Sequence, residues 1–405
     1  MSDIFLNDQN MLESLCNDIK NKNNILLTGP GGCGKTFYLK QIIQRYNSRA
    51  VAITATTGMA GYLIGGQTLH SYFGLGIKKL VVDELVYKIN TFPNLKHKWV
   101  TLNLLIVDEI SMLSSHMFDV LETTARRVRR NDSFFGGIHL LFSGDFLQLP
   151  CIGGTFCFQS KKWKHACFKI YLLTENKRQI DSTFQNILLN ARLGIMTDAD
   201  VSFLQKNNNL VNLDTTIIVS CNDVAVSINH RFLKKLPSRT VFEYKLTGLE
   251  TATFNINISS YCNAPKLLQL KKNAKVVLLT NIDVSQGLCN GSQGIVIDFT
   301  PQGMPIVKFD QTQLTILPQS YDFKLNTKSY VIRQLPLRLA YAITIHKSQG
   351  MTIEKATIDL NDIFEYGQAY VALSRVRSTQ NLTIINGDKT IFKAHPEALK
   401  FYSLL

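Results

Sequence analysis

The sequence predicts an α/β protein with parallel sheets and a smaller β-rich insert in its second half. Short apolar runs alternate with helix-like runs through the first half, an alternation typical of a doubly wound sheet. From about residue 267 to residue 335 the pattern changes to short strands separated by turns. Helix and strand then alternate again. With 405 residues, the chain has room for two or three domains.

Short apolar runs are the candidate parallel strands. They cover residues 25–28, 50–55, 104–107 and 139–143. The strands of the β-rich insert are expected in "KVVLLT", "GIVIDF", "PIVKF" and "LTIL".

Three helices have clear sequence signals. Residues 37–46 follow the first strand as a helix, and residues 114–130 form a second helix with one apolar face. Glu122 precedes Arg126 by four residues on that second helix, which favours an ion pair. The third helix covers residues 182–192, where Ser182 and Gln185 are expected to form a capping box and Gly194 to end the helix.

A glycine-rich stretch directly after the first strand reads G-x-x-x-x-G-K-T. Such a loop, between a strand and a helix N-terminus, binds phosphates through backbone N–H groups. Lys35 is expected to reach the β- and γ-phosphates, and the Thr36 hydroxyl to ligate Mg²⁺. The alternative is a glycine turn that only caps a helix. The predicted nucleotide-binding residues are Gly29, Pro30, Gly31, Gly32, Cys33, Gly34, Lys35 and Thr36.

Two further strand ends carry polar side chains suited to hydrolysis. Asp108 and Glu109 end the third candidate strand. Asp108 is expected to hold Mg²⁺, directly or through water, and Glu109 to polarise the attacking water. Gln148, in "GDFLQLP", is placed to orient that water and to sense hydrolysis. The alternatives are an exposed acidic turn and an ordinary loop glutamine.

Hydrolysis also needs positive charge near the γ-phosphate. Arg178 in "LLTENKRQ" and Arg375 in "AYVALSRVRS" are the candidates, and both lie outside the first α/β unit. If both face the nucleotide, ATP lies in a cleft between two α/β units that closes on binding and opens after hydrolysis. The alternative for each arginine is an ordinary surface residue.

Charge and cysteine content bound the partners and the compartment. The net charge of +14 and a pI near 9.3 indicate a polyanionic partner, with nucleic acid as the first candidate and a basic solvated surface as the alternative. Cys151, Cys157, His165 and Cys167 fit no common zinc-finger spacing, so we expect buried free thiols. This usage predicts a reducing intracellular compartment and does not distinguish nucleus, cytoplasm, organelle or virus-infected cell. We expect no signal peptide and no membrane segment.

These residues occur in an ordered series of blocks that resembles superfamily 1 helicases. The resemblance is strongest to the petite-integration-frequency family, relatives of the RecD and Dda helicases, and runs from residue 6 to about residue 382. The blocks are "LNDQ", "TGPGGCGKT", "AITATTGMAG", "GGQTLHSYFGLG", "VDEISM", "FGGIHLLFSGDFLQLP", "LTENKRQ", "GLCNGSQG", "LAYAITIHKSQGMT" and "GQAYVALSR". The helix "DVLETTAR" also resembles the signature segment of this family. Lys177 stands where the family usually has an aromatic residue, and Cys151 where it usually has a proline.

The resemblance implies two RecA-like lobes and an ATP-dependent DNA helicase that moves 5′ to 3′. The first lobe is expected over 1–167, with a strand-separating insert near 78–98, and the second over 168–266 and 336–405. The insert over 267–335 is expected to be barrel-like. The implied cofactors are ATP and Mg²⁺, and the implied partners are single-stranded and forked DNA. RNA–DNA hybrids and structured DNA stay open, no membrane is expected and no protein partner is indicated. Alternatives are a translocase or RNA-acting motor that opens no DNA duplex, and a nucleotide-gated strand loader.

The resemblance also implies roles for single residues. It places Gln9 on the adenine ring and Gly350 at the nucleotide, makes Arg178 and Arg375 arginine fingers, and puts Gln148 between hydrolysis and strand contact. Tyr72, Phe73 and Tyr341 could stack on bases, although His70 or Phe73 taken alone is more often a core residue. The basic run over 126–130 is favourable at a helix C-terminus in any case. The implied strand-binding residues are Thr54, Thr56, His70, Phe73, Thr344, His346, Lys347 and Ser348.

Overall fold

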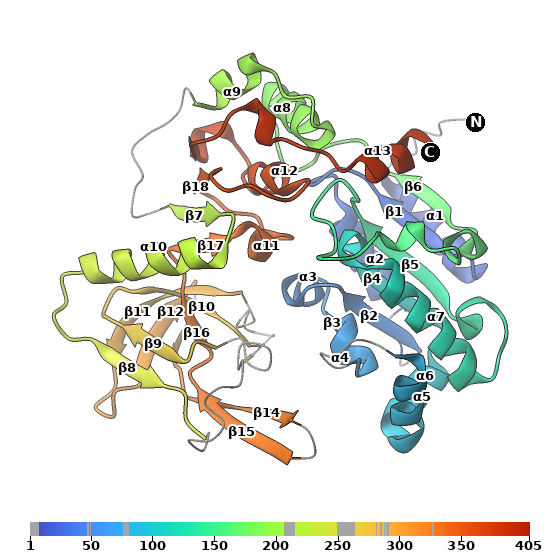
Figure 1. Cartoon of the computed structure of the whole chain (residues 1–405), viewed down its shortest axis with the longest axis horizontal. Helices are drawn as coiled ribbons and strands as arrows, with labels where there is room; N and C mark the ends of the chain where they lie inside the picture. Colours follow the sequence, from blue (N-terminus) through green and yellow to red (C-terminus); the bar gives the residue numbers. More distant parts are fainter. Residues whose placement is uncertain are drawn as a thin grey trace. The chain divides into compact units, whose positions relative to one another are not determined.

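A computed structural model gives the fold of the chain (Figure 1). It describes residues 8–46, 48, 50–75, 81–205, 215–248, 264–280, 282, 283, 286, 288, 291–310, 312–325 and 328–405. By its internal contacts the chain divides into two compact units. Unit 1 comprises residues 1–209 and 345–405, and unit 2 comprises residues 210–344.

Unit 1 is built on a six-stranded sheet in which all neighbouring strands are parallel. The strand order is β3-β2-β4-β5-β1-β6. This sheet confirms the predicted α/β class and contains the four predicted strands. The bounds are β1 (Ile25–Thr28), β2 (Val51–Ala55), β3 (Gln67–Thr68), β4 (Leu104–Asp108), β5 (His139–Gly144) and β6 (Lys169–Leu172).

Alternate residues of the central strands point to opposite faces of this sheet, and both faces are buried. Leu105 and Val107 of β4 belong to one hydrophobic cluster, which also includes residues of α4, α5, α6 and α7. Leu104 and Ile106 belong to a second cluster with residues of α1 and α2. Helices therefore cover both faces, which explains why the strands read as continuous apolar runs. The bounds are α1 (Asp8–Lys20), α2 (Lys35–Tyr46), α3 (Gly58–Leu63), α4 (Leu69–Phe73), α5 (Val82–Thr91), α6 (Pro93–Thr101) and α7 (Ser115–Arg129).

The chain remains in unit 1 beyond the sheet. Strand β6 lies after residue 167, the predicted end of the first lobe. Its backbone nevertheless pairs with β1 in the six-stranded sheet. Strands β18 and β19 also pair in parallel. The lobe boundaries themselves stay predictions. The remaining elements of unit 1 are α8 (Ser182–Leu193), α9 (Asp198–Gln205), α11 (Ile345–Ser348), β18 (Ala356–Asp359), α12 (Gln368–Leu373), β19 (Leu382–Ile385) and α13 (Pro396–Ser403).

Helix termini follow the sequence with one correction. On α7, Arg126 and Glu122 form the predicted ion pair at 2.8 Å. On α8, the predicted capping box of Ser182 and Gln185 is wrong. Asp181 is the N-cap, and its carboxylate accepts the backbone N–H groups of residues 183 and 184. Gly194 ends α8 in the left-handed conformation, as predicted.

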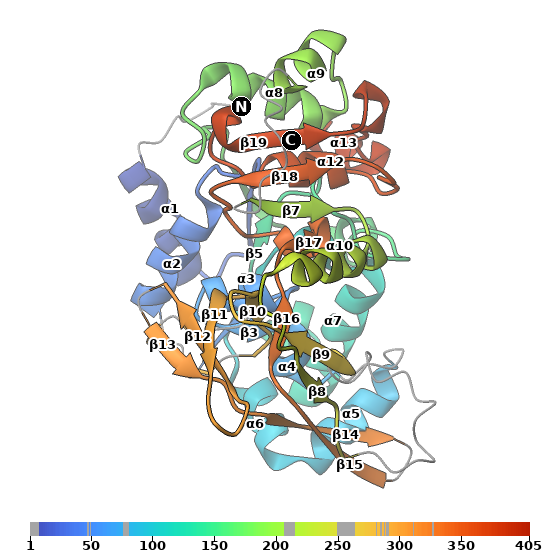
Figure 2. The same ribbon diagram turned by 90° about the vertical axis from the view of Figure 1, so that its left-hand side faces the viewer.

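Unit 2 combines a short parallel pair with antiparallel strands (Figure 2). Helix α10 packs on the parallel pair β7–β17 through Ala225, Ile217 and Ala342. A five-stranded antiparallel sheet has the order β13-β12-β11-β10-β16. Its buried side chains form a hydrophobic core of their own together with residues of β9 and α10. The bounds are β7 (Thr216–Val219), α10 (Asn222–Lys235), β8 (Phe242–Lys245), β9 (Leu267–Leu270), β10 (Lys275–Leu278), β11 (Gln293–Phe299), β12 (Pro305–Phe309), β13 (Thr312–Thr315), β14 (Gln319–Leu325), β15 (Lys328–Gln334), β16 (Leu337–Leu339) and β17 (Ala342–Thr344).

The cysteines and the helix lengths bear on two further predictions. Cys16, Cys33, Cys151 and Cys157 are buried free thiols, whereas Cys167 is exposed, against the prediction. Cys167 ends a short 3₁₀ turn, where its side chain lies outside the packed core. Within the described ranges, no helix has both the length and the apolar character needed to cross a bilayer.

Candidate active site

The glycine-rich loop lies between β1 and α2, as its sequence predicts. Gly32 has a φ of +90°, and a Cβ at this position would come within 2.9 Å of the Arg178 Cβ. Both the backbone conformation and the close approach require glycine. The loop is therefore packed directly against the segment that carries the first predicted arginine finger.

Two polar groups of the loop are satisfied by the protein itself. The Lys35 ammonium donates to the carbonyl oxygens of Gly29 and Pro30, each at 2.7 Å. The Gly31 N–H donates to the hydroxyl of Tyr370 on α12, also at 2.7 Å. Tyr370 is buried, and burial raises the pKa of its hydroxyl, so the group is neutral when it accepts this hydrogen bond.

The acidic pair occupies the carboxyl end of β4. Burial, with the neighbouring Glu109 carboxylate as the second cause, raises the pKa of Asp108 to about 7. A buried carboxylate in this state favours a nearby cation. The backbone of Glu109 is left-handed, with φ 56° and ψ 49°. Its carboxylate accepts a hydrogen bond of 3.0 Å from Gln349 Nε2.

Gln148 lies on a tight turn that follows β5. The turn is closed by a 3.0 Å bond from the Gln148 N–H to the carbonyl of Asp145. Gln148 is buried, and its Oε1 has no hydrogen-bond partner among the described residues. Its Nε2 lies near the phosphate loop, since a Cβ on Gly31 would be 3.5 Å away. The predicted water-orienting amide thus lies beside the loop.

Asp145 anchors this turn through a buried network that sequence reasoning missed. Arg192 on α8 donates two hydrogen bonds of 2.9 Å to its carboxylate. The Tyr402 hydroxyl of α13 donates a third, at 3.1 Å. Tyr402 also forms a 2.6 Å hydrogen bond with the Thr28 hydroxyl at the end of β1. The network therefore joins the Gln148 turn to the strand that precedes the phosphate loop.

Both predicted arginine fingers belong to unit 1, the unit that holds the phosphate loop. Arg178 donates to the Ser374 carbonyl at 2.7 Å, and Arg375 donates to Val371 O and Ser374 Oγ. Burial and the positive charge of Arg178 lower the pKa of Arg375 to about 9. Arg375 is buried and Arg178 is half-buried, and the Arg178 charge disfavours that of Arg375, so an anion beside Arg375 would stabilise its charged form.

The predicted strand-binding residues of the first lobe differ in exposure. Thr54 is buried and donates to the Ile106 carbonyl at 2.6 Å, while Thr56 donates to the Glu109 carbonyl at 2.8 Å. His70 is exposed on α4. Phe73 lies in the hydrophobic core with its ring 4.3 Å from that of Trp99. The placement of Phe73 matches the alternative that made it a core residue, and its role in strand binding stays a prediction.

The residues predicted from "TIHKSQG" follow one another through a strand end and a short helix. Thr344 ends β17 and is buried. His346 and Lys347 lie on α11, where Lys347 is exposed. The Ser348 hydroxyl is buried and donates to the Ile345 carbonyl at 2.7 Å. Tyr341 is also buried and stacks on Phe232 with centroids 5.4 Å apart.

Three other sequence features are the basic run over 126–130, the insert predicted near 78–98 and Gln9. In the basic run after Glu122, Arg127 pairs with Asp83 and Arg129 donates to four backbone carbonyls. The insert predicted near 78–98 is helical in its described part, as α5 and the start of α6. Residues 78–80 and the side chain of Gln9 are outside the described part of the chain.

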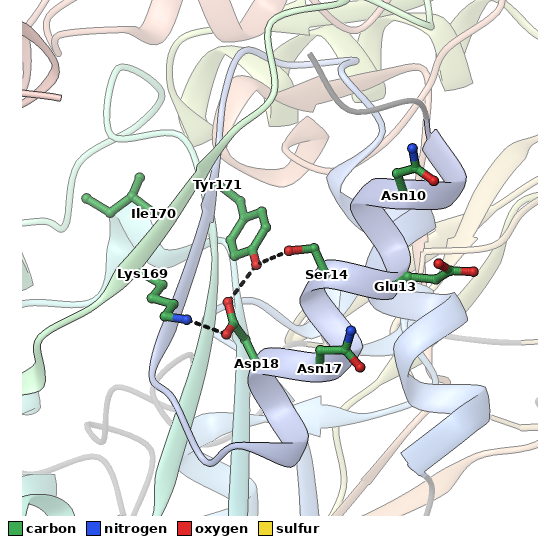
Figure 3. Close-up of a pocket in the computed structure, with 8 residues that line it drawn as sticks. All are labelled: Asn10, Glu13, Ser14, Asn17, Asp18, Lys169, Ile170 and Tyr171. Carbon is green, nitrogen blue, oxygen red and sulfur yellow. Dashed lines mark hydrogen bonds and ion pairs between the residues drawn. The ribbon is translucent and has the colours of Figure 1, made fainter. Parts of the chain in front are cut away.

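A polar groove of about 630 Å³ lies away from these residues, between α1 and β6 (Figure 3). Asp18 accepts hydrogen bonds from Lys169 and from the Tyr171 hydroxyl, the latter at 2.6 Å. Ser14 completes the chain of polar contacts with a 2.8 Å bond to Tyr171. No predicted catalytic residue lines this groove, so it has no part in the site described above.

Comparison with known proteins identifies the family. The model for PIF1-like helicases matches residues 6–201, and that for the DNA helicase Pif1 2B domain matches residues 254–299. The structure of Pif1 helicase from Candida albicans is 30% identical, covers 99% of both chains and superposes with a TM-score of 0.88. The chain belongs to the PIF1-like helicase family. Its RecA-like architecture and the family predicted from its sequence blocks are thereby confirmed.

Two further relatives add detail to this PIF1-like assignment. The ATP-dependent DNA helicase PIF1 of Xenopus laevis is 39% identical in a match that covers 95% of this chain and 62% of that protein. This chain spans about six tenths of the length of the PIF1 relatives it matches. The Pif1 helicase from Bacteroides in complex with ADP-AlF3 and ssDNA is 28% identical, with a TM-score of 0.77 over 99% of this chain and 97% of that one.

Residues that sequence reasoning missed in this PIF1-like helicase share one property. Gln349, Tyr370 and Arg192 each contact a predicted site residue or its turn from a distant part of the chain. Gln349 and Tyr370 occur inside the blocks "HKSQG" and "GQAYVALSR", so their position was a usable signal. Arg192 lies outside all of these blocks, so no sequence signal marked it.

Proposed function

We propose that this chain is an ATP-dependent DNA helicase that moves 5′ to 3′ along single-stranded DNA and opens duplex DNA ahead of it. The observation that carries the proposal is the gathering of the phosphate loop, the acidic pair, the Gln148 amide, the half-buried Arg178 and the buried Arg375 within one unit. The relatives named as ATP-dependent DNA helicases, and the relative bound to ADP-AlF3 and ssDNA, support the nucleotide and the strand.

Thr36 and Asp108 are the residues that would hold Mg²⁺. Hydroxyl and carboxylate oxygens are the ligands that this ion prefers. The buried Asp108 carboxylate, with its raised pKa, fits this assignment because a cation would restore its charged form. When bound, the ion would neutralise phosphate charge as the bond to the γ-phosphate breaks.

The other side chains divide the remaining work. Lys35 leaves the carbonyls of its own loop and donates to phosphate oxygens. Glu109 accepts a proton from the attacking water, and the Gln148 amide orients that water. Arg178 and Arg375 stabilise the negative charge that develops on the γ-phosphate.

The contacts to the DNA strand are proposed for α4, for the residues that follow β2 and for α11. His70 and Lys347 are exposed and offer donors to backbone phosphates. Thr56 lies next to the acidic pair, so a strand held there is close to the reacting phosphate. The direction of travel rests on membership of the family, because these contacts do not rank the grip of one segment over another.

The test uses two duplexes that differ only in carrying a 5′ or a 3′ single-stranded tail. We expect ATP-dependent unwinding of the 5′-tailed duplex alone. Glu109→Gln is the matched control, because it keeps the loop and the arginines but removes the carboxylate that accepts the proton. It should bind nucleotide and unwind neither duplex.

Each other result has a definite meaning. Unwinding of the 3′-tailed duplex alone would reverse the proposed direction. Strand-stimulated ATP turnover without unwinding would replace the helicase by a translocase. Nucleotide-dependent strand binding without sustained turnover would favour a loader. Near-normal turnover in Glu109→Gln would remove Glu109 from the proposed chemistry.

A further inference from the structure

Gln349 makes a direct contact with the proposed catalytic carboxylate. Its Nε2 donates to Glu109 Oε2 at 3.0 Å across a sequence separation of 240 residues. Gln349 is only 1% exposed and Glu109 is half-buried, so the contact is shielded from water on the Gln349 side. The next residue, Gly350, also lies close, since a Cβ there would be 3.6 Å from Glu109 Oε1. The Glu109 carboxylate is thus enclosed on one side by this turn.

The same short segment carries proposed strand contacts and touches an arginine finger. Lys347 is exposed two residues before Gln349. The carbonyls of Ser348 and Met351 each accept a 3.4 Å hydrogen bond from Arg375 Nη1. A displacement of this segment would therefore reach both the carboxylate and the second finger.

The Gln349 side chain is only half satisfied. Its Oε1 is buried and has no hydrogen-bond partner among the described residues. Buried amide oxygens are nearly always paired, because an unpaired acceptor carries an uncompensated desolvation cost. An amide that holds Glu109 with one atom and leaves the other unpaired is suited to change partners.

We propose that Gln349 is a positioning residue that restrains the Glu109 carboxylate until a DNA strand engages α11. The hydrogen bond from Gln349 occupies a Glu109 oxygen that would otherwise accept a proton from water. Engagement of the strand at α11 shifts Gln349 and frees that oxygen. The inference rests on the proposed function, because it explains how a bound DNA strand would stimulate ATP turnover.

The test is Gln349→Met, which keeps the length and volume of the side chain but removes the donor. ATP turnover is measured with and without a single-stranded oligothymidylate, together with KM for ATP. We expect turnover without the strand to rise about fivefold, the factor that one hydrogen bond typically carries. Turnover with the strand and KM should stay close to wild type, so the stimulation ratio falls. Gln380→Met, at an exposed position, is the matched control and should leave the ratio unchanged.

The possible results separate this inference from the proposed function. A wild-type stimulation ratio in Gln349→Met would overturn the inference and leave the helicase intact. A parallel loss of turnover with and without the strand would also overturn it, because Gln349 would then assist the chemistry directly. Absence of strand stimulation in the wild type would overturn both. Gln349→Asn, which withdraws the donor by one methylene, repeats the test if Gln349→Met melts at a lower temperature.

Discussion

At the scale of single residues, the Asp145–Arg192 pair shows how a charge is kept inside unit 1. Both side chains are buried, and two hydrogen bonds of 2.9 Å join them. Burial alone would raise the pKa of Asp145, but the Arg192 guanidinium outweighs it and holds that pKa below its usual value. The pair fixes the turn that carries Gln148, so its loss affects both stability and the site.

We predict that Arg192→Met lowers the free energy of unfolding by about 3–5 kcal/mol at pH 7, because it leaves a buried carboxylate without its cation. The stabilisation from Asp145 is present above the unfolded pKa of about 4 and is lost as pH falls through the lower folded pKa. The gap between variant and wild type should therefore narrow toward acid pH in urea titrations. Arg127→Met removes an exposed pair with Asp83 and should cost less than about 1 kcal/mol. Equal losses in the two variants would contradict the assignment.

At the scale of elements, the Arg129 side chain on α7 caps the C-terminal end of the neighbouring helix α6. Its Nη1 donates to the carbonyls of Trp99, Val100 and Leu102 at 2.7–2.8 Å, and its Nε donates to Gly136 O at 2.6 Å. The last carbonyls of a helix have no partner within the helix. A planar guanidinium can reach several of them at once, which a lysine ammonium does less well. Arg129 on α7 is therefore the C-terminal cap of α6.

We predict that Arg129→Met lowers the free energy of unfolding by about 1–3 kcal/mol, because carbonyls that are mostly partly buried lose a charged donor. The measurement is denaturant unfolding followed by circular dichroism. Arg130→Met removes the same charge from an exposed neighbour and should stay within about 0.5 kcal/mol of wild type. If Arg130→Met proves as costly as Arg129→Met, net charge rather than capping explains the effect.

Elements whose signals are local were predicted well from the sequence. The apolar run of β4 and the periodic face of α7 each depend on a few neighbouring residues. The cap of α8 was misassigned because Asp181 and Ser182 are both good N-cap residues and stand side by side. The phosphate loop and the acidic pair occur as compact motifs, whereas Gln349 meets Glu109 across 240 residues. The block that contains Gln349 marks the residue as a candidate, but no local pattern shows that it pairs with Glu109.

At the scale of the whole molecule, the net charge of +14 bears on how a polyanion binds. Binding of a basic protein to DNA releases counterions, so the affinity falls as salt rises. This term is independent of base sequence and dominates contacts to the phosphate backbone. It can be assigned to single lysines when the slope, rather than the affinity alone, is measured.

We predict that Lys347→Ala reduces the slope of log affinity for single-stranded DNA against log salt by somewhat less than one unit. Each neutralised phosphate contributes about 0.7 to that slope for single strands. Lys400→Ala, exposed on α13, removes the same charge where no strand contact is proposed and should leave the slope unchanged. Fluorescence anisotropy between low and moderate salt measures both. Identical slopes in Lys347→Ala and wild type would place Lys347 away from the DNA backbone.

The inward bonds of Lys35 change what an arriving nucleotide does to its loop. With the ammonium already held by Gly29 and Pro30, phosphate binding is an exchange of ligands rather than the filling of a vacant charge. The free energy gained is the amount by which the Lys35 ammonium binds charged phosphate oxygens more strongly than neutral carbonyl oxygens. From this is subtracted the cost of leaving the Gly29 and Pro30 carbonyls to the solvent or to new partners. Product release runs the exchange backwards. Under the proposed ATPase activity, the departing phosphate would compete with an intramolecular ligand that never diffuses away, and this competition would assist the emptying of the site between cycles.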